Sequence, residues 1–284
     1  MLVWIVFTEK GEIFMMNVAE AIKARRSVRT FDGRQLDAEV KGRLLDLMAQ
    51  IEAPLGVTVA FRALAAKEHG LICPVVTGTE LYIGGKVENG PDASVGFGYA
   101  FEHMILYAQS LGLGTVWLGG TMNRTAFEAA MELGENEIMP CATPVGYTAK
   151  KMSVREGLMR KAVKADERLP FETLFFKDSF DVPLTYEKAG DLSVPLEMVR
   201  LAPSAVNKQP WRLVVCDDAV HFYLKRSKGF QPDGKLDMQM VDMGIALCHF
   251  VLSAEERGLR TEVIKNDPLL SSDGMGYVVS CKLI

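Results

Sequence analysis

An internal repeat constrains the fold of this chain more than any other feature of its sequence. Residues 98–115, GYAFEHMILYAQSLGLGT, match residues 244–261, GIALCHFVLSAEERGLRT. Helices often end in Gly, so part of the match is generic capping, but the small residues at the start, the shared His and the shared GLxT are more specific. The repeat therefore predicts two related halves that pack about a pseudo-twofold axis, as identical subunits of a dimer do. The identical pairs are Gly98/Gly244, Ala100/Ala246, His103/His249, Leu106/Leu252, Ala108/Ala254, Gly112/Gly258, Leu113/Leu259 and Thr115/Thr261.

A weaker echo links APLGVTVAFR at residues 53–62 with APSAVNKQPWR at residues 202–212, after a slip of one residue. The first copy has lost the polar residues of the second. In a pseudo-dimer, one of the two symmetry-related sites is therefore expected to lack polar function.

The pattern of elements predicts an α+β fold with a central mixed or antiparallel sheet flanked by helices. We expect an N-terminal extension over 1–16, a first half over 17–180 and a second half over 181–284. Helices and strands do not alternate in the rhythm that a doubly wound parallel sheet needs. Apolar spacing predicts helices at 17–26, 37–51 and 93–112, with Asn17 and Glu20 as a capping box. The expected strands, many of them rich in β-branched or aromatic residues, are 71–78, 78–85, 115–120, 138–147, 211–218, 219–226 and 276–284.

Composition excludes several classes of protein. With 284 residues, 49% of them hydrophobic, the chain can bury a substantial core. Its net charge of -4 and the lack of a long basic block argue against nucleic-acid partners and an anionic membrane surface. Five scattered cysteines without a CxxC pair favour reduced thiols in a cytoplasm over disulfides or a zinc cluster.

The opening MLVWIVF is too short for a membrane span or an ordinary signal peptide. We expect it to be an edge strand or an artefact, and we expect natural translation to begin at Met15 or Met16.

Residues KARRSVRTFDG place Arg25, Arg26, Ser27 and Arg29 within five positions at the end of a predicted helix. Such close guanidinium groups repel one another unless an anion or acidic side chains lie between them, and their geometry suits phosphate oxygens. Two interpretations remain: a phosphate site, or a solvated helix end whose cations interact with the helix dipole.

The segment LAPSAVNKQPWR restricts its backbone with Pro203 and Pro210, so its polar side chains are held on a stiff loop. The amides of Asn207 and Gln209 each offer a donor and an acceptor, which suits the edge of a flat heterocycle. A polar turn that caps a helix is the alternative, but it needs only Ser204 or Asn207.

The stretch GLGTVWLGG ends at Gly119 and Gly120, where backbone can approach a ligand closely. It matches no dinucleotide-binding or P-loop pattern. His103 and His249 are expected to be packing residues. The absence of HExxH and GxSxG sequences leaves metal and acyl-transfer chemistry without support.

Together, RRSVRTF, APSAVNKQPWR, GLGTVWLGG and PVGY resemble the nitroreductase family of FMN-dependent oxidoreductases, in particular its long-chain branch with a duplicated core. The resemblance spans most of residues 17–265. It implies that Arg25, Arg26, Ser27 and Arg29 hold the FMN phosphate and ribityl chain, and that Asn207 faces the isoalloxazine, with Ser204 and Gln209 as weaker candidates. It further implies a backbone N–H of Gly119 or Gly120 near flavin N5, and a phosphate contact from Arg168, with Lys164 as second choice.

One departure from the family pattern concerns order. Ordinary members carry the APSxxNxQPW loop soon after the Arg cluster, whereas about 170 residues separate them here. Family members build each FMN site across a homodimer interface, so a fused pseudo-dimer would combine the Arg25–Arg29 segment of one half with Asn207 of the other. The resemblance thus predicts one FMN per chain, in a monomer or a homodimer.

The activity implied is reduction of nitro compounds, quinones or similar small acceptors by NAD(P)H in a ping-pong cycle at the flavin, with no catalytic protein acid or base. A non-catalytic flavin-binding protein for storage or sensing, and a structural or interaction protein with a vestigial fold, are the alternatives.

Overall fold

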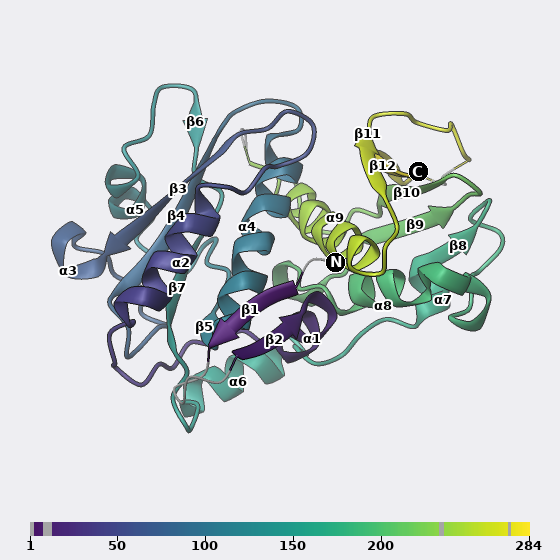
Figure 1. The fold of residues 1–284 in the computed structure, drawn as a ribbon. Helices are drawn as coiled ribbons and strands as arrows, with labels where there is room; N and C mark the ends of the chain where they lie inside the picture. The colour runs from purple at the N-terminus through teal and green to yellow at the C-terminus, as the bar shows by residue number, and fades with distance from the viewer. Residues whose placement is uncertain (1–2, 8–12, 233–235, 272–273) are drawn as a thin grey trace.

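The structure, a computed structural model, describes residues 3–7, 13–232, 236–271 and 274–284 and holds two five-stranded sheets (Figure 1). The first has the order β3 (Val59–Ala65), β4 (Leu81–Glu88), β7 (Ala142–Tyr147) and β5 (Leu113–Thr115), with β6 (Glu137–Ile138) paired to β4. The second has the order β11 (Thr261–Ile264), β12 (Gly276–Leu283), β10 (Ala219–Leu224), β9 (Trp211–Val215) and β8 (Phe175–Lys177). The predicted α+β class is confirmed.

The two sheets share one topology. The order β3-β4-β7-β5 in the first corresponds to β9-β10-β12-β11 in the second, and every neighbouring pair in both series is antiparallel. Strand β8 extends the second sheet by pairing parallel to β9, although its residues fall before our predicted boundary at 180.

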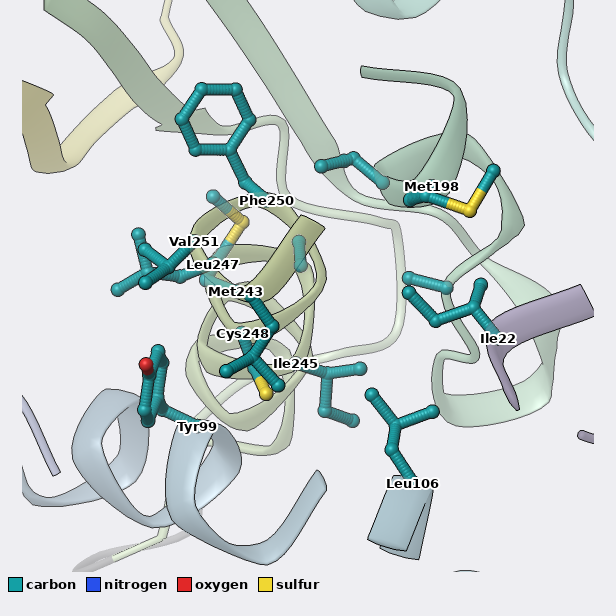
Figure 2. Packing of buried hydrophobic residues seen from close by; sticks show 14 of the residues in the cluster. Ile22, Tyr99, Leu106, Met198, Met243, Ile245, Leu247, Cys248, Phe250 and Val251 are labelled. Carbon is teal, nitrogen blue, oxygen red and sulfur yellow. The ribbon is translucent and has the colours of Figure 1, made fainter. Parts of the chain in front are cut away.

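Two long helices lie between the sheets. Helix α4 (Ala93–Ser110) packs against β4 and β5, and α9 (Met238–Glu256) packs against the strands of the second sheet (Figure 1). Nearly every residue of both helices is buried. Figure 2 shows α9 with Tyr99 and Leu106 of α4 on one side and Met198 of α8 (Ser193–Leu201) on another. The core is thus continuous across the two halves.

Helices α4 and α9 cross at a pair of repeat-equivalent glycines. A Cβ on Gly98 would overlap the carbonyl oxygen of Val241, and one on Gly244 would overlap the carbonyl oxygen of Val95. The backbones therefore touch where any side chain would hold them apart. This crossing brings the second half of the chain against the first.

The predicted helices are present. Helix α1 (Val18–Ala24) has the expected capping box, in which Asn17 Oδ1 accepts from the Glu20 N–H at 2.8 Å and Glu20 Oε2 accepts from the Asn17 N–H at 3.3 Å. Helix α2 (Ala38–Met48) and α4 occupy the other two predicted ranges. The remaining helices are α3 (Ala66–His69), α5 (Arg124–Ala130), α6 (Val154–Ala162), α7 (Phe171–Leu174) and the 3-10 segments Glu187–Leu192 and Ala205–Asn207.

Some strand predictions were wrong. Residues 71–78 form turns, since Pro74 lacks an N–H and the segment bends to bring Gly78 against the backbone of Phe31. In 115–120 the strand stops at Thr115, leaving one bridge from Leu118 to Ala142. Strands β3, β8 and β11 were not predicted.

The N-terminal segment does not form an edge of either large sheet. Strand β1 (Val3–Phe7) pairs antiparallel with β2 (Ile13–Asn17) in a separate two-stranded sheet. Residues 1–2 and 8–12 of the predicted extension lie outside the described residues. Among the described helices, none combines the length and apolarity that crossing a membrane requires.

The glycine crossing makes a direct prediction. Gly244→Ala should lower the free energy of unfolding by about 1–3 kcal/mol, because the new methyl group forces the two backbones apart. In Gly42→Ala on α2, the added methyl has open space, so this control should gain about 0.5–1 kcal/mol from helix propensity. Urea denaturation followed by circular dichroism would measure both, and equal stability of the two variants would contradict the role assigned to the crossing.

Candidate functional site

One cavity collects most of the predicted site residues from both halves. Its wall from the first half includes the Arg25–Arg29 segment, Trp117 and the 160–168 segment, and its wall from the second half is the 203–207 loop with the start of α9. Of the eleven predicted ligands, seven line this cavity: Arg25, Arg26, Ser27, Arg29, Arg168, Ser204 and Asn207. Lys164, Gln209, Gly119 and Gly120 do not line it.

The Arg segment is an extended strand-like stretch rather than a solvated helix end. Helix α1 stops because Arg25 adopts extended backbone angles, and Ser27 then bridges parallel to Thr115 of β5. The Val28 N–H donates to the Thr115 carbonyl at 2.8 Å. This pairing fixes the direction in which the side chains on either side of the buried Val28 project.

Five arginines line the cavity, and their charges act on one another. Burial lowers the pKa of Arg25, Arg29 and Arg168, and neighbouring arginines lower each of them further. The Nε atoms of Arg29 and Arg168 are buried without a hydrogen-bond partner. A cluster with mutual repulsion and unsatisfied donors suits an anion with several acceptor oxygens. Alongside the predicted arginines, the cluster includes Arg160 of α6.

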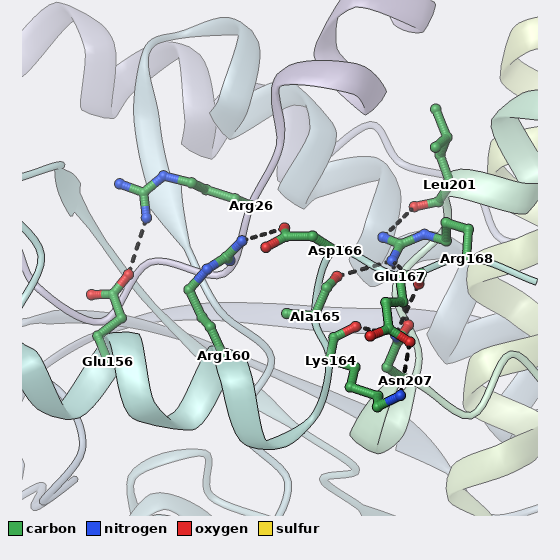
Figure 3. Close-up of polar contacts among 10 residues, drawn as sticks. All are labelled: Arg26, Glu156, Arg160, Lys164, Ala165, Asp166, Glu167, Arg168, Leu201 and Asn207. Carbon is green, nitrogen blue, oxygen red and sulfur yellow. Dashed lines mark hydrogen bonds and ion pairs between the residues drawn. The ribbon is translucent and has the colours of Figure 1, made fainter.

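Two carboxylates hold this cluster in place (Figure 3). Glu156 of α6 is buried; its Oε1 accepts from Arg26 Nη1 at 3.0 Å, and its Oε2 accepts from the Arg29 N–H at 3.1 Å. Thr30 Oγ1 donates to the same carboxylate at 2.8 Å. Asp166 forms an ion pair with Arg160 at the edge of the cavity. Helix α6 therefore both positions and partly neutralises the arginines.

The 202–209 loop has strained backbone at its centre. Val206, Asn207 and Gln209 all have positive φ, at 47°, 55° and 48°. Such angles are rare for non-glycine residues, and for a β-branched residue such as Val206 they mark a conformation that its surroundings enforce. Ser204 Oγ accepts from the Gln209 N–H at 2.8 Å and closes the loop on itself.

Asn207 and Arg168 join this loop to the 164–168 segment (Figure 3). Asn207 Nδ2 donates to the carbonyls of Lys164 and Glu167 at 2.7 and 3.0 Å, and Arg168 Nη1 donates to Asn207 Oδ1 at 3.4 Å. The Lys164 ammonium faces solvent and pairs with Glu167 at 3.1 Å. Gln209 is buried, and its Oε1 accepts from the Leu169 N–H at 2.9 Å. In this arrangement the two amide side chains brace the loops.

Gly119 and Gly120 line an adjoining cavity that shares Ala205 and Met238 with the first. Arg124 of α5 donates Nη2 to the Gly119 carbonyl at 2.5 Å and to the Pro140 carbonyl at 3.2 Å. This contact fixes the peptide plane between Gly119 and Gly120 in the adjoining cavity.

A buried network connects the cavity to the helix crossing. Glu102 of α4 forms an ion pair with Arg25, Nε to Oε1 at 3.8 Å, and accepts from Trp117 Nε1 at 2.8 Å. His249 Nε2 lies 3.0 Å from Glu102 Oε1, while His249 Nδ1 donates to the Met198 carbonyl at 2.8 Å. His249 is therefore the satisfied packing residue that its repeat position predicted. Burial lowers the pKa of His103 to about 4, which keeps it neutral at physiological pH.

Several residues of the site carried no sequence signal. Arg160, Glu156 and Asp166 come from a helix and loop without a motif, and Glu102 and Asp242 sit within apolar helices. A lone acid among buried helix positions was the one available clue, because such residues rarely lie in a core without a partner. No group of three His, Cys, Asp or Glu side chains in the described part of the chain could hold a metal ion.

Comparison with known proteins places the chain in a family. The family model described as "Putative TM nitroreductase" matches residues 17–254. The chain belongs to this nitroreductase family.

Individual relatives and solved structures are similar to the chain to different extents. A "Putative NADH dehydrogenase/NAD(P)H nitroreductase" of Methanothermobacter thermautotrophicus is 27% identical over 165 residues, which are 51% of this chain and 85% of that protein. A crystal structure titled as a "putative nitroreductase" of Thermotoga maritima has a TM-score of 0.62 and 22% identity, and the match covers 95% of this chain and 94% of that one. An FMN-dependent nitroreductase of Clostridium difficile has a TM-score of 0.40 and 20% identity over 50% of this chain and 94% of its own.

Residues 53–62 are the segment in which the sequence predicts an echo of the site loop. Residues 55–58 and the start of α4 line a separate cavity. There a Cβ on Gly96 would overlap the side chain of Val57. The contact between this segment and α4 is therefore apolar.

Glu156 should be required for the stability of the nitroreductase. Glu156→Ala leaves the Arg29 N–H without its acceptor and the Thr30 hydroxyl with Ser153 Oγ alone, so the free energy of unfolding should fall by about 2 kcal/mol. Glu128→Ala on α5 removes an exposed carboxylate that pairs with Arg124 at 3.4 Å and should cost less than about 1 kcal/mol. Thermal unfolding of both variants would measure the difference, and a Glu156→Ala protein as stable as Glu128→Ala would contradict the assignment.

Proposed function

We propose that this chain is an FMN-dependent oxidoreductase that uses NAD(P)H to reduce nitro compounds, quinones or similar small acceptors. The observation that carries the proposal is the single cavity in which the Arg25–Arg29 segment of one half meets the Ser204–Asn207 loop of the other. The names of the relatives, an NAD(P)H nitroreductase and an FMN-dependent nitroreductase, support the same reaction class.

The residues of the cavity fit a phosphorylated flavin. Five guanidinium groups, two of them with buried unsatisfied Nε atoms, would hold the phosphate. Trp117 on one wall and Met238 on the other supply apolar surface. When bound, FMN would supply the redox chemistry, taking hydride from NAD(P)H and passing electrons to the acceptor in a ping-pong cycle.

The chain's own residues would bind the flavin and orient it. Glu156 and Glu102 hold the arginines in fixed positions, so little reorganisation accompanies the arrival of an anion. The bonds from Asn207 to the carbonyls of Lys164 and Glu167 keep the two cavity loops together. Gly119 and Gly120 would leave backbone close to the reacting edge of the ring, since neither bears a side chain.

We also propose that the chain is a fused pseudo-dimer with one flavin site. The shared strand order of the two sheets and the pairing of Gly98 with Gly244 support a duplication. In the first half, the segment equivalent to the site loop packs Val57 against Gly96, so the space is filled by an apolar side chain. The five free cysteines fit a reducing cytoplasm.

Flavin content and reduction test the function. Purified protein should take up about one FMN per chain, and anaerobic NADPH or NADH should bleach its absorbance between 300 and 550 nm. Binding of FMN without bleaching by either nucleotide would instead indicate storage or sensing. A colourless protein that ignores added FMN would refute the proposal.

Arginine substitutions test the phosphate assignment. Arg29→Ala combined with Arg160→Ala should weaken FMN binding by at least about a hundredfold, because each charge-assisted hydrogen bond contributes about 1.5–3 kcal/mol. Riboflavin, which lacks the phosphate, should bind to the double variant as it does to the wild type. The control Arg62→Ala removes an exposed guanidinium that pairs with Glu132 and should leave FMN affinity unchanged. Fluorescence titration would measure all three proteins, and retention of full FMN affinity by the double variant would refute the assignment.

A further inference from the structure

Asp242 is a buried acid in the cavity wall, and only one of its two carboxyl oxygens forms a hydrogen bond. It lies in the first turns of α9 and is 2% exposed. Its Oδ1 accepts from the Ala205 N–H at 2.9 Å, which attaches the helix to the site loop. Its Oδ2 is buried without a hydrogen-bond partner, and the residue lines the cavity that holds the arginine cluster.

The surroundings of Asp242 favour its neutral form. Burial raises the pKa of the Asp242 carboxyl well above its usual range, and the Asp237 carboxylate on the same helix raises it further. Asp237 is itself paired with Arg226 at 2.6 Å. Burial also raises the pKa of the Cys141 thiol to about 12, so this neighbour brings no charge at physiological pH.

The charged groups across the cavity do not neutralise Asp242 either. Arg25, Arg29 and Arg168 face the cavity with Asp166, but among the described residues none of them forms an ion pair with Asp242. Their partners are Glu102, Glu156 and backbone carbonyls instead. An acid without a cation beside it remains protonated in a buried site.

Packing of the helix against the loop does not require an acid at this position. Gly98 and Gly244 are equivalent in the repeat. Gly96 lies two residues before Gly98 and Asp242 lies two residues before Gly244, so Gly96 is the repeat equivalent of Asp242. At Gly96 the first half places Val57 against the helix, with no polar group between them. Packing of the helix against the loop therefore needs no carboxyl group in the first half, and in the second half Asp242 Oδ2 is not used for this packing.

We propose that Asp242 stands in the cavity wall as a neutral carboxylic acid whose Oδ2–H donates a hydrogen bond to an uncharged acceptor of the bound ligand, a ring carbonyl or ring nitrogen. This rests on the function proposed above, with flavin as the ligand. Asp242 is then a positioning residue for the ring, at a place separate from the arginines that would hold the phosphate. Because a carboxylate at this place would repel a ring acceptor, binding of the ring depends on the proton.

Riboflavin is the suitable probe, since it carries the ring without a titrating phosphate. Wild-type affinity for riboflavin should fall as the pH rises through the pKa of Asp242, because the donor is lost when the acid ionises. Asp242→Asn keeps both an acceptor for the Ala205 N–H and a donor, so it should bind riboflavin with near wild-type affinity and without this pH dependence. Asp242→Ala should lose about tenfold in affinity for riboflavin and for FMN at neutral pH.

Infrared spectra of the protein without flavin give a second readout. The C=O stretch of a protonated carboxyl group should be present in the wild type at neutral pH and reduced in Asp242→Asn. Asp92→Asn, at the start of the equivalent helix α4 and outside the site, is the matched control and should change neither the spectrum nor the affinity.

The outcomes separate the two proposals. Wild-type protein that binds neither riboflavin nor FMN would overturn the proposed function and this inference together. Wild-type protein that binds both, with Asp242→Ala and Asp242→Asn binding equally well and with the same pH dependence, would overturn the role of Asp242 alone. An unchanged carboxyl band in Asp242→Asn would also overturn it.

Discussion

The backbone contact between α4 and α9 is the interaction on which the rest of the structure depends. Gly98 and Gly244 let the two helices approach until each backbone touches the other, and the sheets then stack outward on either side. A side chain at either position would separate the helices, and with them the walls of the cavity between the halves. Helix α9 carries Asp242 one half-turn before this contact, and α4 carries Glu102 one turn after it. The crossing therefore sets the distance between the acid in the cavity wall and the network that holds Arg25.

The acids that pair with the arginines of the site differ in burial. Asp166 is exposed and pairs with Arg160, whereas the buried Glu156 and Glu102 lie 3.0 Å from Arg26 and 3.8 Å from Arg25. Buried ion pairs are costly to desolvate and weak evidence for stability, so their retention here is better explained by positioning. The strained backbone at Val206 and Asn207 fits the same view, because the surrounding hydrogen bonds hold a loop shape that the free chain would avoid.

In the proposed pseudo-dimer, the asymmetry of the halves decides how many sites the chain has. Both halves supply a sheet of the same strand order and a long buried helix, yet the loop before β3 contains Leu55 and Val57 where the loop before β9 contains Ser204 and Val206. Val57 occupies the space above Gly96, and no described arginine lines the cavity there. A duplicated fold can thus keep its packing in both halves while only one half keeps the polar groups that a ligand needs.

The sequence alone determined the α+β class, the relation between the two long helices and the cluster of arginines at 25–29, because these depend on local patterns: apolar spacing, a repeat and a run of like charges. Arg168, which also lines the cavity, was implied only by the family resemblance. The sequence could not determine which side chains turn toward the ligand. Asn207 and Gln209 have amides that could bind a ring edge, but in the tertiary structure these amides form hydrogen bonds with the backbone of the 164–169 segment. Arg160, Glu156 and Asp242 carry no motif and become neighbours only when α6 and α9 dock. Contacts between residues far apart in the chain are set by packing, and packing is decided by the whole core rather than by any one segment.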